Sequence, residues 1–160
     1  MAADNYSRLV QLAEQVFAFK NDPAQLNVDD TVIEKLLRIH SATLLEERDA
    51  NGPVAWVLLI PTTLDLMHRF LGGTITEKQL FELTDPGMVY EAVYLCSALV
   101  LDEYRRKGIV KRLASEGIEA IRKGHPLKAI FVWPFSPEGD KAAETISKVI
   151  ELPLFTRNHD

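Results

Sequence analysis

Cysteine is almost absent from this chain of 160 residues, in which Cys96 is the single example. One cysteine is too few for an internal disulfide, which excludes the disulfide-stapled class of small secreted domains. Residues 1–10 also lack the basic start and the apolar stretch of a secretion signal. We therefore expect a cytoplasmic protein in which Cys96, set in an apolar strand, is a buried and unreactive thiol.

Long apolar runs and net positive charge are also missing. No segment approaches the roughly 20 apolar residues of a membrane-spanning helix, and the net charge of −5 disfavours binding to nucleic acid or to an anionic membrane. The four histidines show no spacing typical of metal ligands, so no metal site is expected. With 47% hydrophobic residues, the chain is expected to fold as one globular domain over residues 1–160.

Cations nevertheless concentrate in one short segment. Five of the 18 Lys and Arg residues are Arg105, Arg106, Lys107, Lys111 and Arg112. They lie between the apolar run 93–101 and a segment of helical periodicity, 109–123. Free backbone N–H groups and the helix dipole favour an anion at a helix start, where cations cost stability. The pattern predicts a phosphate-bearing ligand, and a solvated basic helix cap is the alternative.

Hydrophobic periodicity predicts a mixed α/β fold. Helices are expected over residues 4–19, from Asp29 or Asp30 to Ile39, and over 64–71, 77–83 and 109–123, with strands over 42–48, 54–60, 93–101, 129–133 and 152–156. Asn51-Gly52 predicts a hairpin turn. The helix between 93–101 and 129–133 makes these two strands parallel. Residues 1–40 form a helical N-terminal region, and the helices within 62–85 form an insertion that fills space on the sheet or covers a site.

The segment LVLDEYRRKGIVKRLA, residues 99–114, resembles the pyrophosphate-binding motif of the GNAT acyltransferases, [Q/R]-x-x-G-x-[G/A]. Arg105 and Gly108 occupy its fixed positions, and Val110 departs from the last small residue. The resemblance extends over about residues 42–147. It implies a mixed central sheet flanked by helices, with two parallel strands that splay on either side of the loop and helix that bind the cofactor.

The resemblance also implies that acetyl-CoA or another acyl-CoA binds at this loop. Pro134 removes a donor from the strand ladder, and if the two parallel strands part there, the amides of pantetheine can pair with the first strand. The residues expected at the cofactor are Leu99, Val100, Leu101, Arg105, Arg106, Lys107, Gly108, Ile109, Val110 and Lys111.

Catalytic residues are less clearly marked. Residues 140–147 resemble a later helix of the family, N-x-x-A-x-x-L-Y, but Ser147 replaces the Tyr that protonates the departing thiolate in many members. The family's strand carboxylate falls near Tyr94, which we take as the candidate catalytic residue that orients a water or acts as an acid. Glu91 lies three residues earlier. The alternatives are an aromatic sheet residue for Tyr94 and a solvated charge for Glu91.

The expected function is transfer of an acetyl or other short acyl group from CoA to an amine of a small molecule or peptide. A small acceptor that is not strongly anionic fits the net negative charge. The alternatives are a non-catalytic acyl-CoA-binding module and an interaction domain whose basic loop binds an acidic partner. Because few residues follow Ser147, the sheet is expected to be underprotected on the side of residues 129–133. Either a homodimer or the N-terminal helix is expected to cover that edge.

Overall fold

The computed structural model describes residues 5, 7–9, 11–12, 30–134 and 137–158, and its centre is a five-stranded mixed sheet. The strands are β1 (Leu44–Asp49), β2 (Gly52–Thr62), β3 (Ala92–Val100), β4 (Ala129–Val132) and β5 (Leu154–Thr156), arranged in chain order. The first three strands are antiparallel, whereas β3, β4 and β5 are mutually parallel. The predicted mixed α/β fold and the predicted parallel pair are confirmed.

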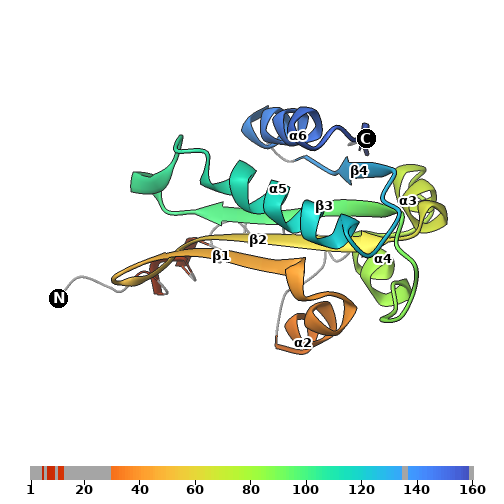
Figure 1. Ribbon diagram of the computed structural model, residues 1–160, viewed down its shortest axis with the longest axis horizontal. Helices are drawn as coiled ribbons and strands as arrows, with labels where there is room; N and C mark the ends of the chain where they lie inside the picture. The colour runs from red at the N-terminus through yellow and green to blue at the C-terminus, as the bar shows by residue number, and fades with distance from the viewer. Residues whose placement is uncertain (1–4, 6, 10, 13–29, 135–136, 159–160) are drawn as a thin grey trace.

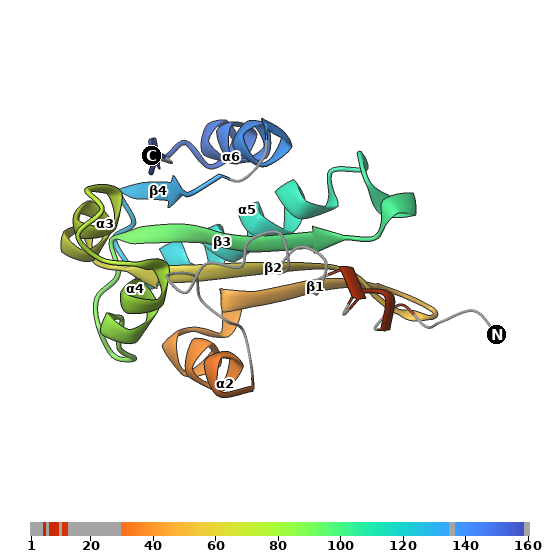
Figure 2. The ribbon, with the colours of Figure 1, turned by 180° about the vertical axis from the view of Figure 1, so that it is seen from behind.

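Helices flank this sheet (Figure 1). The helix α5 (Ile109–Arg122) packs across β1, β2 and β3, and α6 (Pro137–Ile150) packs beside α5 and β4. The helix α2 (Asp30–Ile39) joins β1 through the short 3-10 turn η1 (Ser41–Thr43). The described residues at the N-terminus are also helical, and Figure 2 shows them on the face of the sheet opposite α5. The rest of the expected helix over 4–19 lies outside the described residues.

Two helices form the connection between β2 and β3, and local capping explains their bounds. The side chain of Thr63 accepts a hydrogen bond from the N–H of Leu66 at the start of α3 (Leu64–Leu71). Thr76 and Gln79 form a reciprocal capping box at the start of α4 (Glu77–Leu83). Both helices have the predicted bounds because each cap is made within a few residues of the sequence.

The predicted hairpin between β1 and β2 is confirmed, and its turn lies one residue earlier than predicted. Ala50 and Asn51 form the turn, while Gly52 begins β2 with a φ of 117°. Asp49 accepts a hydrogen bond from the N–H of Asn51 at 2.7 Å. The left-handed conformation therefore falls on Gly52 alone, because glycine has no Cβ to oppose it, and Asn51 keeps a negative φ.

The strands β3 and β4 pair over only part of their length. Residues Ala92 to Leu95 pair with Ala129 to Val132, after which β4 ends. The strand β3 continues to Val100, and it carries an extra residue, Cys96, because Leu58 pairs with Ser97 whereas Leu59 pairs with Leu95. This bulge lies where β3 and β4 part. Beyond it, the edge of β3 opposite β2 is left open by β4.

The edge of the sheet beyond β4 is formed by β5. Ile130 pairs with Leu154 and Val132 with Thr156, so β4 itself is an interior strand. Phe155 of β5 is 41% exposed. Among the described N-terminal residues, Asn5 donates a hydrogen bond to Asp49 of β1, far across the sheet from β5. A homodimer formed through the β5 edge stays a prediction.

Part of the core lies between the sheet and α5, where Gly117 of the helix approaches the sheet. A Cβ at Gly117 would lie 2.7 Å from Leu59 Cδ1, 2.8 Å from Leu45 Cδ1 and 3.3 Å from the carbonyl oxygen of Ala42. Contacts this short require the neighbouring groups to move. A side chain at this position would therefore crowd the packing of α5 on the sheet and displace the ends of Leu45 and Leu59.

We predict that Gly117→Ala lowers the free energy of unfolding by about 1–3 kcal/mol through overpacking, despite the better helix propensity of alanine. The matched control is Gly124→Ala, since a Cβ at Gly124 meets nothing within 4 Å. Urea denaturation measures both variants. Equal stability of the two would contradict the assigned close approach.

Candidate functional site

A cavity of about 510 Å³ opens where β3 and β4 part. Its walls are the second half of β3, the end of β4, the first turns of α5 and one face of α6. The lining residues are Leu12, Val57, Leu58, Leu59, Leu95, Cys96, Ser97, Ala98, Leu99, Val100, Arg105, Val110, Ala114, Val132, Trp133, Pro134, Gly139, Ala142, Ala143 and Ile146. Its volume lies within the range of small-molecule pockets. Most of these side chains are apolar, so the interior suits an uncharged, extended part of a ligand.

The backbone of β3 gives this cavity polar groups. The N–H of Leu101 donates to the carbonyl oxygen of Val54 at 2.9 Å, which sets the phase of the antiparallel ladder. Because N–H and C=O groups alternate in direction along such a ladder, those of Ala98 and Val100 point away from β2. They point to the side that β4 does not reach. An amide-bearing ligand in the cavity can pair with them as an added strand does.

The basic loop, residues 105–111, lies beside this cavity and shares Arg105 with its lining. It follows the 3-10 turn η2 (Asp102–Tyr104) and leads directly into α5. Arg106 and Gly108 adopt positive φ values of 64° and 73°. A Cβ at Gly108 would meet nothing within 4 Å, so the loop is open to solvent at this point. Backbone N–H groups in such turns and at a helix start form concave sites for anions.

The cations of the sequence cluster differ in whether a carboxylate pairs with them. Arg112 is turned toward β1, where it pairs with Glu47 at 2.5 Å, and it also pairs with Glu116 at 3.4 Å. Arg106 and Lys111 are exposed, and no carboxylate among the described residues pairs with either of them. The first turn of α5 contains no acidic residue. The helix start therefore carries positive charge that an external anion can compensate.

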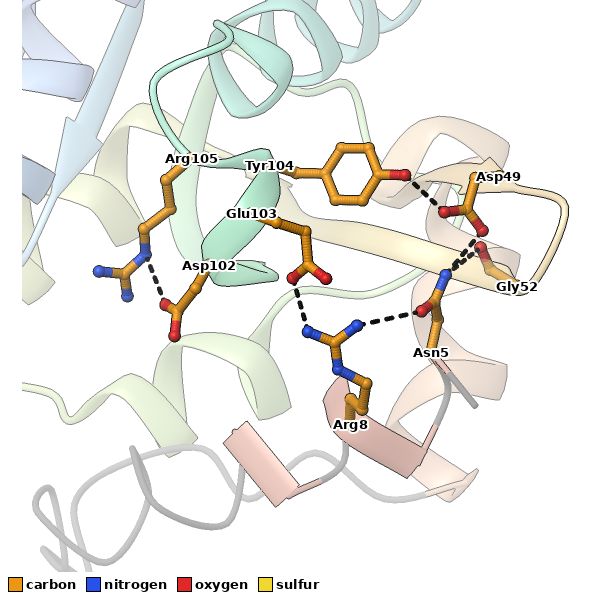
Figure 3. Close-up of polar contacts among 8 residues, drawn as sticks. All are labelled: Asn5, Arg8, Asp49, Gly52, Asp102, Glu103, Tyr104 and Arg105. Atoms are coloured by element: carbon orange, nitrogen blue, oxygen red, sulfur yellow. Dashed lines mark hydrogen bonds and ion pairs between the residues drawn. The ribbon is translucent and has the colours of Figure 1, made fainter. Parts of the chain in front are cut away.

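Several polar contacts hold η2 and the basic loop in place (Figure 3). Tyr104 donates a hydrogen bond from its hydroxyl to Asp49 Oδ2 at 2.5 Å, and Arg8 pairs with Glu103 at 2.6 Å. Asp102 lies 3.3 Å from Arg105 Nε. The hydrogen bond from Tyr104 is the main reason why the pKa of Asp49 lies below its ordinary value. These contacts connect the loop to the β1–β2 hairpin and to the N-terminal residues.

Tyr94 lies in the core, one strand position before the cavity lining begins at Leu95. It is 1% exposed, and its hydroxyl donates to Glu77 Oε2 at 2.5 Å. Burial, followed by the charge of Glu77, raises the pKa of Tyr94 well above its ordinary value, so the phenol is neutral at physiological pH. Sequence reasoning missed Glu77, because an acidic residue in the first turn of a helix usually faces solvent.

The other residues considered from the sequence lie elsewhere. Glu91 precedes β3, and its carboxylate is 3.8 Å from Lys128 Nζ, at the opposite end of β3 from the cavity. Ser147 donates its hydroxyl to the carbonyl oxygen of Leu152 at 2.5 Å, so it supports the connection between α6 and β5. Cys96 is half-buried and lines the cavity, whereas a fully buried thiol was expected. The bulge at the end of the β3–β4 pairing explains its partial exposure.

Comparison of the chain with protein-family models, with curated proteins and with solved structures finds no match. Across the described part of the chain, no helix combines the length and apolar character needed to cross a membrane. In the same residues, no three His, Cys, Asp or Glu side chains are grouped to hold a metal ion. The cavity and the basic loop are therefore the features of the structure that bear on function.

We predict that Tyr94→Phe lowers the free energy of unfolding by about 1–3 kcal/mol, because the buried carboxylate of Glu77 loses a hydrogen-bond donor. The matched control is Tyr90→Phe. Tyr90 is equally buried, but its hydroxyl donates to the neutral carbonyl oxygen of Asp85 at 2.7 Å. Thermal and urea denaturation at neutral pH should show the larger loss for Tyr94→Phe. An equal or larger loss for Tyr90→Phe would contradict the importance of the Tyr94–Glu77 bond.

Proposed function

We propose that the protein is an acyltransferase that moves an acetyl or other short acyl group from CoA to an amine. One observation carries the proposal. The cavity lies where β3 and β4 part, and it shares Arg105 with a basic loop at the start of α5. A ligand with an uncharged, amide-bearing arm and a pyrophosphate at one end matches this combination of apolar cavity and anion site.

In the proposed complex, the pyrophosphate lies on residues 105–111 and the pantetheine arm runs along β3. Leu99, Val100 and Leu101 lie along this arm, and the thioester reaches the bulge at Cys96. This arrangement is the one that the resemblance to the GNAT acyltransferases implies. The apolar lining supports an uncharged acyl group, since Arg105 is the only charged side chain among the described residues that line the cavity.

The reaction requires a neutral amine, whose nitrogen attacks the thioester carbonyl carbon. The C–N bond forms, the C–S bond breaks, and CoA leaves as a thiolate that takes up a proton. The amine gives up one proton. We propose that Tyr94, which lies one strand position before the cavity lining begins at Leu95, is the proton donor, and that Glu77, which accepts the hydrogen bond of its hydroxyl, is the proton acceptor.

A non-catalytic acyl-CoA-binding module is the second candidate, and a specific observation favours it. The described lining contains no Asp, Glu, His, Lys or Tyr side chain, and Ser147 is directed at Leu152. Release of free CoA from acetyl-CoA, measured across a panel of amines, separates the two functions. Binding without release under all amines supports the module and contradicts the enzyme.

Binding of CoA should protect Cys96 from alkylation, because the single thiol of the chain lines the cavity beside the proposed pantetheine arm. At a CoA concentration ten times the Kd, we expect the rate of reaction with N-ethylmaleimide to fall about tenfold by mass action. Adenosine diphosphate is the control, since it carries the pyrophosphate but lacks the arm, and it should leave the rate unchanged. Unchanged labelling under saturating CoA would exclude this cavity.

Substitutions in the basic loop should weaken CoA binding in a graded way. Gly108→Val places a branched side chain where the phosphate approaches, and we expect the larger loss of affinity there. Arg106→Ala should remove one charge-assisted hydrogen bond, which contributes about 1.5–3 kcal/mol. Calorimetric titration with CoA measures both.

Each of these variants has a matched control. Gly87→Val imposes the same kind of backbone strain, with a φ of 88° and open space around it. It should destabilise the fold without changing CoA affinity. Arg112→Ala removes a cation that pairs with Glu47 and should also leave the affinity unchanged. A Gly108→Val variant that binds CoA normally would remove the loop from the site.

A further inference from the structure

The guanidinium of Arg157 lies in a corner formed by two aromatic rings. Its central carbon is 4.5 Å from the ring centroid of Phe70 and 4.7 Å from that of Trp133. The two rings are nearly perpendicular, at 82°, with centroids 6.0 Å apart. Nη1 of Arg157 also donates to the carbonyl oxygen of Ile75 at 3.1 Å. We call the ring faces of Phe70 and Trp133 with this carbonyl oxygen the aromatic corner.

The aromatic corner has the chemistry of a cation site. Perpendicular ring faces within about 6 Å of one charge attract it through their quadrupoles, as in the cages that bind quaternary ammonium groups. No carboxylate in the described residues forms an ion pair with Arg157, so the rings and one carbonyl oxygen are its partners there. Another guanidinium or ammonium group can make the same contacts.

The aromatic corner adjoins the cavity. Trp133 belongs to both, and it follows Val132, the last residue of β4 that pairs with β3. Phe70 comes from α3, which lies beside β4 in Figure 1. Glu77 and Arg157 both lie close enough to Tyr94 to act on its pKa, in opposite directions.

We propose that the aromatic corner binds a fixed cation of the acyl acceptor, and that Arg157 fills the corner until the acceptor displaces it. This inference rests on the proposed acyltransferase function and specifies its substrate class. The acceptor carries a guanidinium or ammonium group in the corner and a second amine, which is deprotonated and acylated at the thioester.

Displacement of Arg157 requires only a side-chain rotation. The backbone N–H of Arg157 donates to the carbonyl oxygen of Val132 at 2.9 Å, which keeps this part of the chain beside β4. The neighbouring Thr156 and Asn158 are exposed. The released guanidinium therefore moves into solvent, while Phe70, which is fully buried beneath it, becomes accessible to the ligand.

The test compares butylguanidinium with butylurea, which has a similar shape and no charge. Trp133 reports binding by fluorescence in a Trp56→Phe background, since the chain has two tryptophans. The Arg157→Ala variant should bind butylguanidinium about tenfold more tightly than it binds butylurea. It should also bind butylguanidinium about tenfold more tightly than the unaltered protein does. Arg157→Lys keeps a cation in the corner and should resemble the Arg157 protein.

A second measurement distinguishes a ligand site in the unaltered protein from a cavity that the Arg157→Ala substitution creates. In the unaltered protein, a large excess of butylguanidinium should shift the NMR signal of the Arg157 Nε–H, and butylurea should not. An unmoved signal at a concentration far above the Kd of Arg157→Ala means that Arg157 is a structural cap, which overturns the inference. Equal binding of the two probes by Arg157→Ala overturns it as well.

Phe70→Leu or Trp133→Leu, each combined with Arg157→Ala, removes a ring face but keeps apolar bulk, and either should abolish the preference for butylguanidinium. Retention of that preference in both would contradict the aromatic corner.

With acetyl-CoA, aminobutylguanidine should be acylated with a higher kcat/KM than aminobutylurea. Protection of Cys96 by CoA in the same samples tests the acyl-CoA proposal separately. Lost cation preference with intact protection overturns the acceptor assignment alone.

Discussion

The limited pairing between β3 and β4 is the constraint on which the rest of the structure depends. Pro134 has no N–H to donate, so it cannot extend the ladder of β4 beyond its last residues. The second half of β3 then faces α6 instead of another strand, and the space between them is the cavity. The basic loop follows the same strand after η2, which places the proposed anion site near the end of the open backbone edge.

Charge is organised locally in this acidic protein. Carboxylates from η2 and from the β1–β2 hairpin hold the loop from one side, through Asp102, Glu103 and Asp49. The ion pair with Glu47 directs Arg112 toward β1 and away from the basic loop. The cations that are left at the start of α5 oppose the helix dipole. The loop is thus held in a shape that favours an anion, and the nearby carboxylates of Asp49 and Glu103 are paired with Tyr104 and Arg8.

The insertion between β2 and β3 adds aromatic and acidic side chains near the cavity. Its helices bring Phe70 and Glu77 against the sheet, where they meet Tyr94 and Trp133. Trp133 also lines the cavity, so this aromatic cluster adjoins it. An insertion that covers the sheet in this way fills the core and also, under the proposed function, shapes the side of the cavity where the acceptor binds.

The sequence by itself determined the features whose physical cause is local. Helix caps act within three or four residues, so α3 and α4 have their predicted bounds. The helical periodicity of α5 and the position of the basic loop could likewise be predicted from the sequence. The Glu47 pairing of Arg112, the Tyr94–Glu77 bond and the place of Arg157 were decided by tertiary structure. Each of these partnerships depends on where distant segments pack, because a side chain finds its partner only after the sheet, α5 and the insertion have assembled.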